Sequence, residues 1–152
     1  QWINSYKRFV AGYESPTHAT WSRKSQSAMI RIPHCRKDKP ASMRIELRNP
    51  DPACNPYLAF SVMLSAGLKG IEEKYELPDP VESGNFRNNS DKFQQLPLQL
   101  HEALTSFAGS SLMKETLGGF IHQKIIENKI FEQELFNNYI TDFEIKTYLP
   151  KL

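Results

Sequence analysis

A charged strand that runs straight into an apolar helix constrains the fold of this chain more than any other feature. The sequence Arg44-Ile45-Glu46-Leu47-Arg48 alternates strictly between charged and apolar residues, which is the period of a β-strand with two unlike faces. Two guanidinium groups and a carboxylate on one face are costly to bury without partners. The pattern alone fits either an exposed edge strand or the floor of a cleft.

The helix that follows favours the cleft. Asn55 is a good N-cap, and Pro56 suits the first helical position, where its missing N–H does no harm. From there to about residue 74 the sequence supports a helix whose first four turns are apolar nearly all round, which predicts burial on most sides. In a cleft floor beside such a helix, a carboxylate can ligate a hard divalent cation and arginines can grip carboxylate or phosphate oxygens.

The rest of the chain divides into a strand-and-loop half, residues 1–54, and a helical half, residues 55–152. The expected elements are a β-like run at 27–32, a connecting loop at 34–42, a polar surface loop at 76–95, a short helix near 98–107 and a last helix at about 119–138. The predicted fold class is α+β, with short antiparallel strands followed by a helical half.

Charge is distributed unevenly along the sequence. Residues 22–48 carry eight Lys and Arg against two acidic residues, a local charge of +6, although the whole chain has only +2. This stretch is either a solvated face or an anion site, and the strand chemistry favours the anion site. Because residues 49–152 are net acidic, nucleic-acid binding is not expected.

The same composition argues against two other classes of protein. No apolar run approaches the ~18 residues that a membrane span needs. Two cysteines, Cys35 and Cys54, do not make a disulfide framework, so we expect free thiols in a reducing cytoplasm. The histidines are scattered without ligand spacing, and no glycine-rich phosphate loop is present.

Four segments in series resemble type I glutamine synthetases. Asn4-Ser5-Tyr6-Lys7-Arg8-Phe9-Val10-Ala11-Gly12-Tyr13-Glu14 resembles N-S-Y-K-R-L-V-P-G-Y-E, residues 27–33 resemble S-A-x-I-R-I-P, residues 44–58 resemble R-I-E-x-R-x-P-D-P-A-A-N-P-Y-L, and residues 66–71 resemble A-G-L-D-G-I. The order and spacing identify the chain as the C-terminal part of that family's catalytic domain. The resemblance implies that an N-terminal β-grasp domain and the first part of the catalytic domain lie upstream of Gln1.

The resemblance also implies roles for individual residues. Arg8 and Arg48 would hold the substrate glutamate and its γ-glutamyl phosphate, and Glu14 would lie on a flap that closes the site and helps to deprotonate ammonium. Arg8 and Glu14 are therefore the expected catalytic residues. The family reaction phosphorylates the γ-carboxylate of glutamate with ATP, after which ammonia displaces the phosphate.

The remaining implied roles concern ATP and metal. Arg31 would contact the ATP phosphates with Arg44 close by, and Glu46 would ligate Mg²⁺ or Mn²⁺. The implied partners are glutamate, ammonia and ATP, in a full-length dodecamer of two stacked hexameric rings. Arg44, Glu46 and Arg48 are expected to share one face of the strand and to point into a concave cleft, with Arg31 and Arg8 nearby.

Two departures from the family pattern leave alternatives open. Ser25-Gln26-Ser27 stands where the family has Asn-Arg-Ser, so a neutral amide replaces a cation that contacts anionic oxygens; on that basis, Gln26→Arg is expected to raise turnover. Phe86 lies near the place of the tyrosine that is adenylylated in some bacterial members, and it cannot accept a nucleotide. Besides a working glutamine synthetase, the sequence allows a γ-glutamyl ligase that uses another amine, or a non-catalytic structural or regulatory relative.

Overall fold

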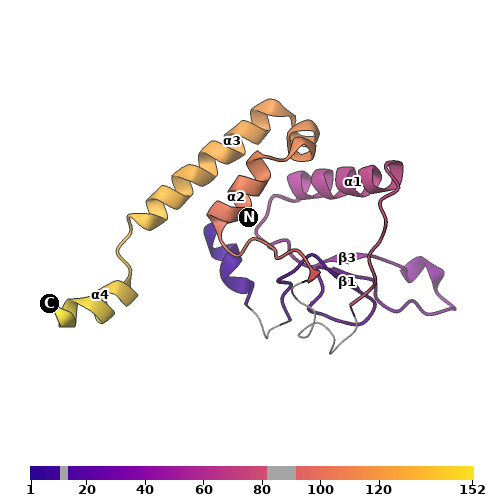
Figure 1. The fold of residues 1–152 in the computed structure, drawn as a ribbon, viewed down its shortest axis with the longest axis horizontal. Coiled ribbons are helices and arrows are strands. Elements are labelled where there is room, and N and C mark those ends of the chain that lie inside the picture. The colour runs from indigo at the N-terminus through magenta and orange to yellow at the C-terminus, as the bar shows by residue number, and fades with distance from the viewer. Residues whose placement is uncertain (11–13, 82–91) are drawn as a thin grey trace.

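The computed structural model describes residues 1–10, 14–81 and 92–152 as an α+β fold with a small sheet and a set of helices (Figure 1). In chain order the elements are the 3-10 helix η1 (Ile3–Arg8), strands β1 (Trp21–Ser22) and β2 (Ile30–Arg31), the 3-10 helix η2 (Pro40–Ser42), strand β3 (Glu46–Leu47), helices α1 (Pro56–Glu72), α2 (Leu100–Ala108), α3 (Ser111–Asn137) and α4 (Asp142–Tyr148), and the 3-10 helix η4 (Leu149–Lys151). Strands thus precede helices, as the sequence predicts.

The sheet has the strand order β1-β2-β3 and is mixed. Strands β2 and β3 are antiparallel as expected, with Arg31 opposite Glu46 and Ile30 opposite Leu47. Strands β1 and β2, however, pair in parallel, so the expectation of antiparallel strands throughout is wrong for this pair. A strand of two residues spans only about 7 Å, so the short connection at 23–29 can return to the starting edge without a helical crossover.

Helix α1 begins where the sequence predicts. Asn55 Oδ1 accepts hydrogen bonds from the backbone N–H groups of Tyr57 (3.0 Å) and Leu58 (3.3 Å), and Pro56 occupies the first turn. The helix packs against α3, where Thr116 Oγ1 donates to Ser65 Oγ at 2.8 Å.

The prediction that α1 is buried on most sides is wrong for this chain. Its described residues include no buried side chain, and Tyr57 and Ile71 are 83% and 74% exposed. A helix that is apolar nearly all round is normally packed against other elements on several sides. Among the described residues, α1 packs mainly against α3.

The surface area makes the same point for the chain as a whole. Only four hydrophobic side chains among the described residues are buried: Phe9, Ala28, Val81 and Leu100. The chain exposes 11570 Å², roughly 3,700 Å² more than the area of about 7,900 Å² expected of a compact monomer of its mass. Much of this surplus lies on α1, α3 and α4, the last two of which run away from the sheet (Figure 1).

The C-terminal helices follow the predicted pattern with two differences. Helix α2 matches the short helix expected near 98–107. Helix α3 is interrupted at Gly118, whose φ of 75° and ψ of 151° are non-helical, so the helix expected at about 119–138 is the part beyond this kink. Helix α4 was not predicted, although Thr141 and Glu144 form a capping box that marks its start.

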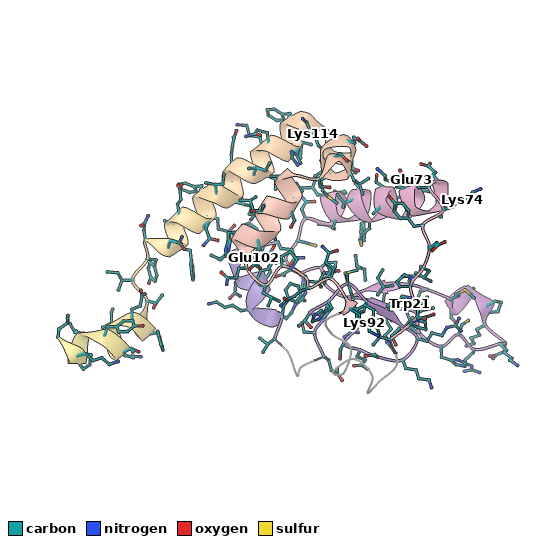
Figure 2. The ribbon with its side chains drawn as sticks, viewed as in Figure 1. Trp21, Glu73, Lys74, Lys92, Glu102 and Lys114 are labelled. Carbon is teal, nitrogen blue, oxygen red and sulfur yellow. The ribbon has the colours of Figure 1, made fainter. Side chains whose placement is uncertain are left out.

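Two backbone hydrogen bonds join residues that precede α2 to the chain at and before β1. Leu96 N donates to Thr17 O at 2.9 Å, and Val81 N donates to Trp21 O at 2.9 Å. The indole of Trp21, which lies in the sheet region in Figure 2, donates to Pro78 O at 2.6 Å. Phe86, the residue nearest the family's adenylylation position, lies outside the described residues.

Candidate functional site

The charged face of the strand is built around Glu46. Arg31 lies opposite it in the sheet register, and Arg31 Nη1 donates to Glu46 Oε2 at 3.0 Å. Arg44 donates through Nε (3.0 Å) and Nη2 (2.8 Å) to Glu46 Oε1. Arg44 lies just before β3, which comprises only Glu46 and Leu47, and these hydrogen bonds place its side chain beside that of Glu46.

These contacts set the ionisation of the carboxyl group. Partial desolvation raises the pKa of Glu46, but the hydrogen bonds from Arg44 and Arg31 together outweigh it, so the pKa lies below its ordinary value. Glu46 is consequently a carboxylate held between two guanidinium groups at neutral pH.

An open pocket lies beside the strand end. It has a volume of about 580 Å³ and is lined by Lys7, Arg8, Val10, Glu14, Ser15, Pro16 and Arg48. Arg48 Nη2 donates to the backbone carbonyl of Glu14 at 3.2 Å, which ties the strand to the segment that follows η1. Arg8 and Arg48, which are expected to bind glutamate, and Glu14, which is expected on the flap that closes the site, thus line one pocket.

The segment that carries Arg8, helix η1 with the residues just before it, is held in place by contacts with two other parts of the chain. Arg8 Nη2 donates to the carbonyls of Asn49 (2.8 Å) and Pro50 (3.1 Å), immediately after the charged strand. From the other side, Glu132 of α3 accepts from the backbone N–H of Ile3 at 2.7 Å. A residue near the end of a long helix therefore helps to place η1 against the pocket.

Two further contacts complete this brace. Lys129 Nζ lies 3.7 Å from the centroid of the Trp2 ring, a cation–π contact, and also pairs with Glu132 at 2.6 Å. Trp2 Nε1 donates to Ala53 O at 3.0 Å. Lys129, Glu132 and Trp2 were not singled out from the sequence, because the contacts of Lys129 with Trp2 and of Glu132 with Ile3 join residues far apart in the chain.

The pocket and the strand retain unused hydrogen-bonding capacity. Ser15 Oγ and Arg48 Nε, on residues that line the pocket, are buried atoms with no hydrogen-bond partner among the described residues, and Arg31 Nε is another. A buried polar atom without a partner is unfavourable. Carboxylate or phosphate oxygens from a ligand would satisfy the two guanidinium donors.

The predicted side chains fall into two groups, and the expectation that they share one cleft stays a prediction. Arg31, Arg44 and Glu46 form a cluster that does not line the pocket of Arg8, Glu14 and Arg48. The reason is that Glu46 is drawn into ion pairs across the sheet, while Arg48, at the strand end, turns toward Glu14. The two groups are adjacent in the sequence, because only Leu47 separates Glu46 from Arg48.

Gln26 has a partner that the sequence did not reveal. With its nitrogen toward Glu14, the amide donates to both carboxylate oxygens, 3.0 Å from Oε1 and 2.5 Å from Oε2. The opposite orientation would set an amide oxygen against a carboxylate, two acceptors facing each other, so the donating orientation is the physical one. Gln26 therefore contacts the carboxylate of Glu14.

The described residues do not by themselves make a metal centre. No group of three or more His, Cys, Asp and Glu side chains among them could hold an ion, and both oxygens of Glu46 accept from arginines. Glu46 fits a metal as one ligand among several, provided that an arginine releases it. In the described ranges, no helix has both the length and the apolar character that a membrane crossing requires.

Comparisons with known proteins agree on a family. Residues 1–148 match the family model described as glutamine synthetase, catalytic domain. The chain is 40% identical to a glutamine synthetase of Mycolicibacterium smegmatis over 98% of its own length and 34% of that protein. It is 41% identical to one of Methanococcus maripaludis, over 97% and 33%. The chain therefore spans about a third of the length of these curated relatives.

Two solved structures share the fold. "GmaS/ADP complex-Conformation 1" superposes with a TM-score of 0.80 at 29% identity, over 98% of this chain and 34% of that one. The Plasmodium falciparum glutamine synthetase gives 0.77 at 24% identity, over 96% and 37%, a likeness of fold. Together with the family match along nearly the whole sequence, these findings show that the chain belongs to the glutamine synthetase catalytic-domain family and comprises part of that domain.

Proposed function

We propose that the protein to which this chain belongs is an ATP-dependent glutamate–ammonia ligase that forms glutamine through a γ-glutamyl phosphate. The observation that carries the proposal is the convergence of Arg8, Glu14 and Arg48 on one pocket. Residues 1–54 would form the active-site half of this region, and residues 55–152 its helical support.

The pocket has the chemistry that a dicarboxylate substrate needs. Arg8 and Arg48 bring positive charge to a site that also contains Lys7, and Arg48 Nε has an unused donor. Guanidinium groups bind carboxylate oxygens with two charge-assisted hydrogen bonds each. We propose that they orient glutamate and stabilise charge on its γ-carboxyl group as the phosphoryl group arrives.

Glu14 supplies the opposite charge in the same pocket. A carboxylate placed beside the glutamate site can hold an ammonium ion and accept a proton from it, which leaves ammonia as the nucleophile. The proton moves to a carboxylate oxygen of Glu14, and the nitrogen lone pair then displaces phosphate from the acyl phosphate.

We propose that the strand cluster serves ATP. Arg31 and Arg44 would contact its phosphates, and Glu46 would be one ligand of a Mg²⁺ or Mn²⁺ ion whose other ligands lie on residues outside this chain. Such an ion, when bound, neutralises charge on the transferring phosphoryl group. The buried Arg31 Nε without a partner supports an anion beside this cluster.

The activity would reside in an assembled protein. The exposed large apolar side chains of α1, α3 and α4 support contacts with the rest of the domain and with further subunits. We propose a homo-oligomer, a dodecamer of two stacked hexameric rings, in the cytoplasm.

The full-length protein tests the proposal. Phosphate release from ATP should require glutamate and ammonium together, and glutamine should appear in equal amount. Arg48→Met should reduce turnover at least about 100-fold, whereas Arg36→Met, which alters an exposed arginine in the loop at 34–42, should leave it unchanged. Product formed only with another amine would identify a different γ-glutamyl ligase. No ATP-dependent product with any amine would favour a non-catalytic relative.

A further inference from the structure

One face of α3 contacts the segment that carries Arg8. Three pairs of residues make these contacts: Lys129 with Trp2, Glu132 with Ile3, and Phe136 with Lys7. Positions 129, 132 and 136 are separated by three and four residues, which is the spacing of side chains on one face of an α-helix. The long helix therefore meets this segment both at its start and close to Arg8.

Glu132 is the central member of this face. Its Oε1 accepts from the backbone N–H of Ile3 at 2.7 Å, and its Oε2 lies 2.6 Å from Lys129 Nζ. The side chains of Lys129 and Glu132 are only 13% and 19% exposed, whereas those of Lys124 and Glu127, a pair with the same spacing on α3, are 59% and 48% exposed. Because water screens a partly buried charge less, the Glu132 carboxylate holds its donors more firmly than the exposed carboxylate does.

The bond to Ile3 matters because of where Ile3 lies. It is the first residue of η1, and the N–H groups at the start of a helix have no acceptor within the helix itself. A 3-10 helix of six residues also has few internal hydrogen bonds to hold it. The acceptor that fixes the start of η1 is therefore supplied by a residue 129 positions further along the chain.

The other end of η1 is Arg8, which lines the pocket. Among the described residues, the hydrogen bonds of its guanidinium group all come from Nη2, which donates to two backbone carbonyls. Its Nη1 and Nε donors are thus left for a ligand. Since η1 is short, a displacement of its start changes the direction in which these donors point.

We infer that Glu132 is a positioning residue for glutamate: by accepting from Ile3 it fixes the start of η1, and thereby directs Arg8 into the pocket. The inference rests on the proposed function and adds to it a residue of the helical half that sets the affinity for one substrate. Lys129 acts on Glu132, by holding its second oxygen. Among the described residues, none of these contacts involves the strand cluster, so ATP binding should be unaffected.

The test measures steady-state kinetics of the full-length protein, with glutamate varied at saturating ATP, Mg²⁺ and ammonium, and then with ATP varied at saturating glutamate. Glu132→Leu should lower kcat/KM for glutamate about tenfold and leave the KM for ATP within about twofold, because a small displacement of a substrate-binding group is costly even when its cause lies far from the chemistry.

Two double variants isolate the hydrogen bond from the charge. Lys129→Met removes the cation, so that a neutral acceptor can take the place of the carboxylate. Lys129→Met/Glu132→Gln keeps an oxygen that can accept from Ile3, whereas Lys129→Met/Glu132→Leu, of similar size, has none. Relative to Lys129→Met, the Gln variant should keep kcat/KM for glutamate within about threefold, and the Leu variant should lose about tenfold.

The matched control is Glu127→Leu. It makes the same substitution in the exposed pair with Lys124, one and a half turns earlier on α3, and no kinetic constant should change. A loss at position 132 that is specific to glutamate and is rescued by the Gln double variant supports the inference.

Three results overturn the inference. The first is a kcat/KM for glutamate that changes less than about twofold in Glu132→Leu; if leucine at this position prevents folding, an unchanged value in Glu132→Gln, whose single oxygen must serve two donors, has the same force. The second is an equal loss in the two double variants. The third is an equal loss for glutamate and ATP, which would mean a general structural role. A wild-type protein without glutamate-dependent activity would instead defeat the proposed function, and the inference with it.

Discussion

Arg31 and Glu46 stand directly opposite each other on neighbouring antiparallel strands, and Arg31 Nη1 lies 3.0 Å from Glu46 Oε2. Both side chains are about a quarter exposed, so the pair is accessible to a ligand at the sheet surface. The ion pair thus fixes the direction of a carboxylate that we propose as a metal ligand, while a buried donor of the arginine, Nε, stays without a partner.

Glu46→Ala in the full-length protein should reduce turnover at least about 100-fold, because the metal site loses an oxygen ligand and the transferring phosphate is misplaced. The melting temperature should fall by only a few degrees, since partly exposed ion pairs add little to stability. The control is Asp38→Ala, which removes the exposed pair with Arg36 and should alter neither quantity. A collapsed melting temperature with normal turnover in the folded fraction would show that Glu46 is structural.

The ionisation of Glu46 can be followed in this chain by NMR of its carboxyl carbon. The apparent pKa should lie below the ordinary value of 4.5, because the hydrogen bonds from Arg44 and Arg31 outweigh desolvation. A lowered pKa stabilises the fold above the pKa of the unfolded chain, and this contribution is lost as the pH falls through the folded pKa. Arg44→Met should raise the pKa. A value at or above 4.5 in the unaltered chain would contradict the observed contacts.

Asn55→Ala should destabilise the chain by about 1 kcal/mol, the usual cost of losing an N-cap. The Oδ1 atom of Asn55 satisfies two backbone donors at the start of α1, and alanine leaves both to solvent. Urea unfolding followed by circular dichroism measures the change. Asn55→Asp retains an acceptor and should stay close to the unaltered stability; equal losses in both variants would mean that the cap contributes nothing.

The isolated chain should not bind ATP and Mg²⁺ tightly. The described residues offer guanidinium donors for phosphate but no cluster of carboxylates for the metal, and most of the family's length lies outside the matched third. Calorimetry should therefore give no submicromolar affinity. A submicromolar dissociation constant would mean that the site is far more self-contained than its contacts indicate.

The sequence by itself determined the features that depend on neighbouring residues. The alternation from Arg44 to Arg48, the N-cap at Asn55 and the order of strands before helices all follow from local periodicity and capping. The four motif segments also identified the family. The capping box of Thr141 and Glu144 was equally local, so α4 could have been predicted by the same reasoning.

Only the tertiary structure decided which distant side chains meet. The ion pair of Arg31 with Glu46 depends on the strand register, and the grip of Arg8 on the carbonyl of Asn49 joins residues that are 41 positions apart. The contact of Gln26 with Glu14 depends on the paths of two loops, which periodicity does not encode. The apolar sequence of α1 likewise predicted that the helix is buried. Burial, however, depends on which elements pack against a helix, and only the fold showed that the described residues cover little of the surface of α1.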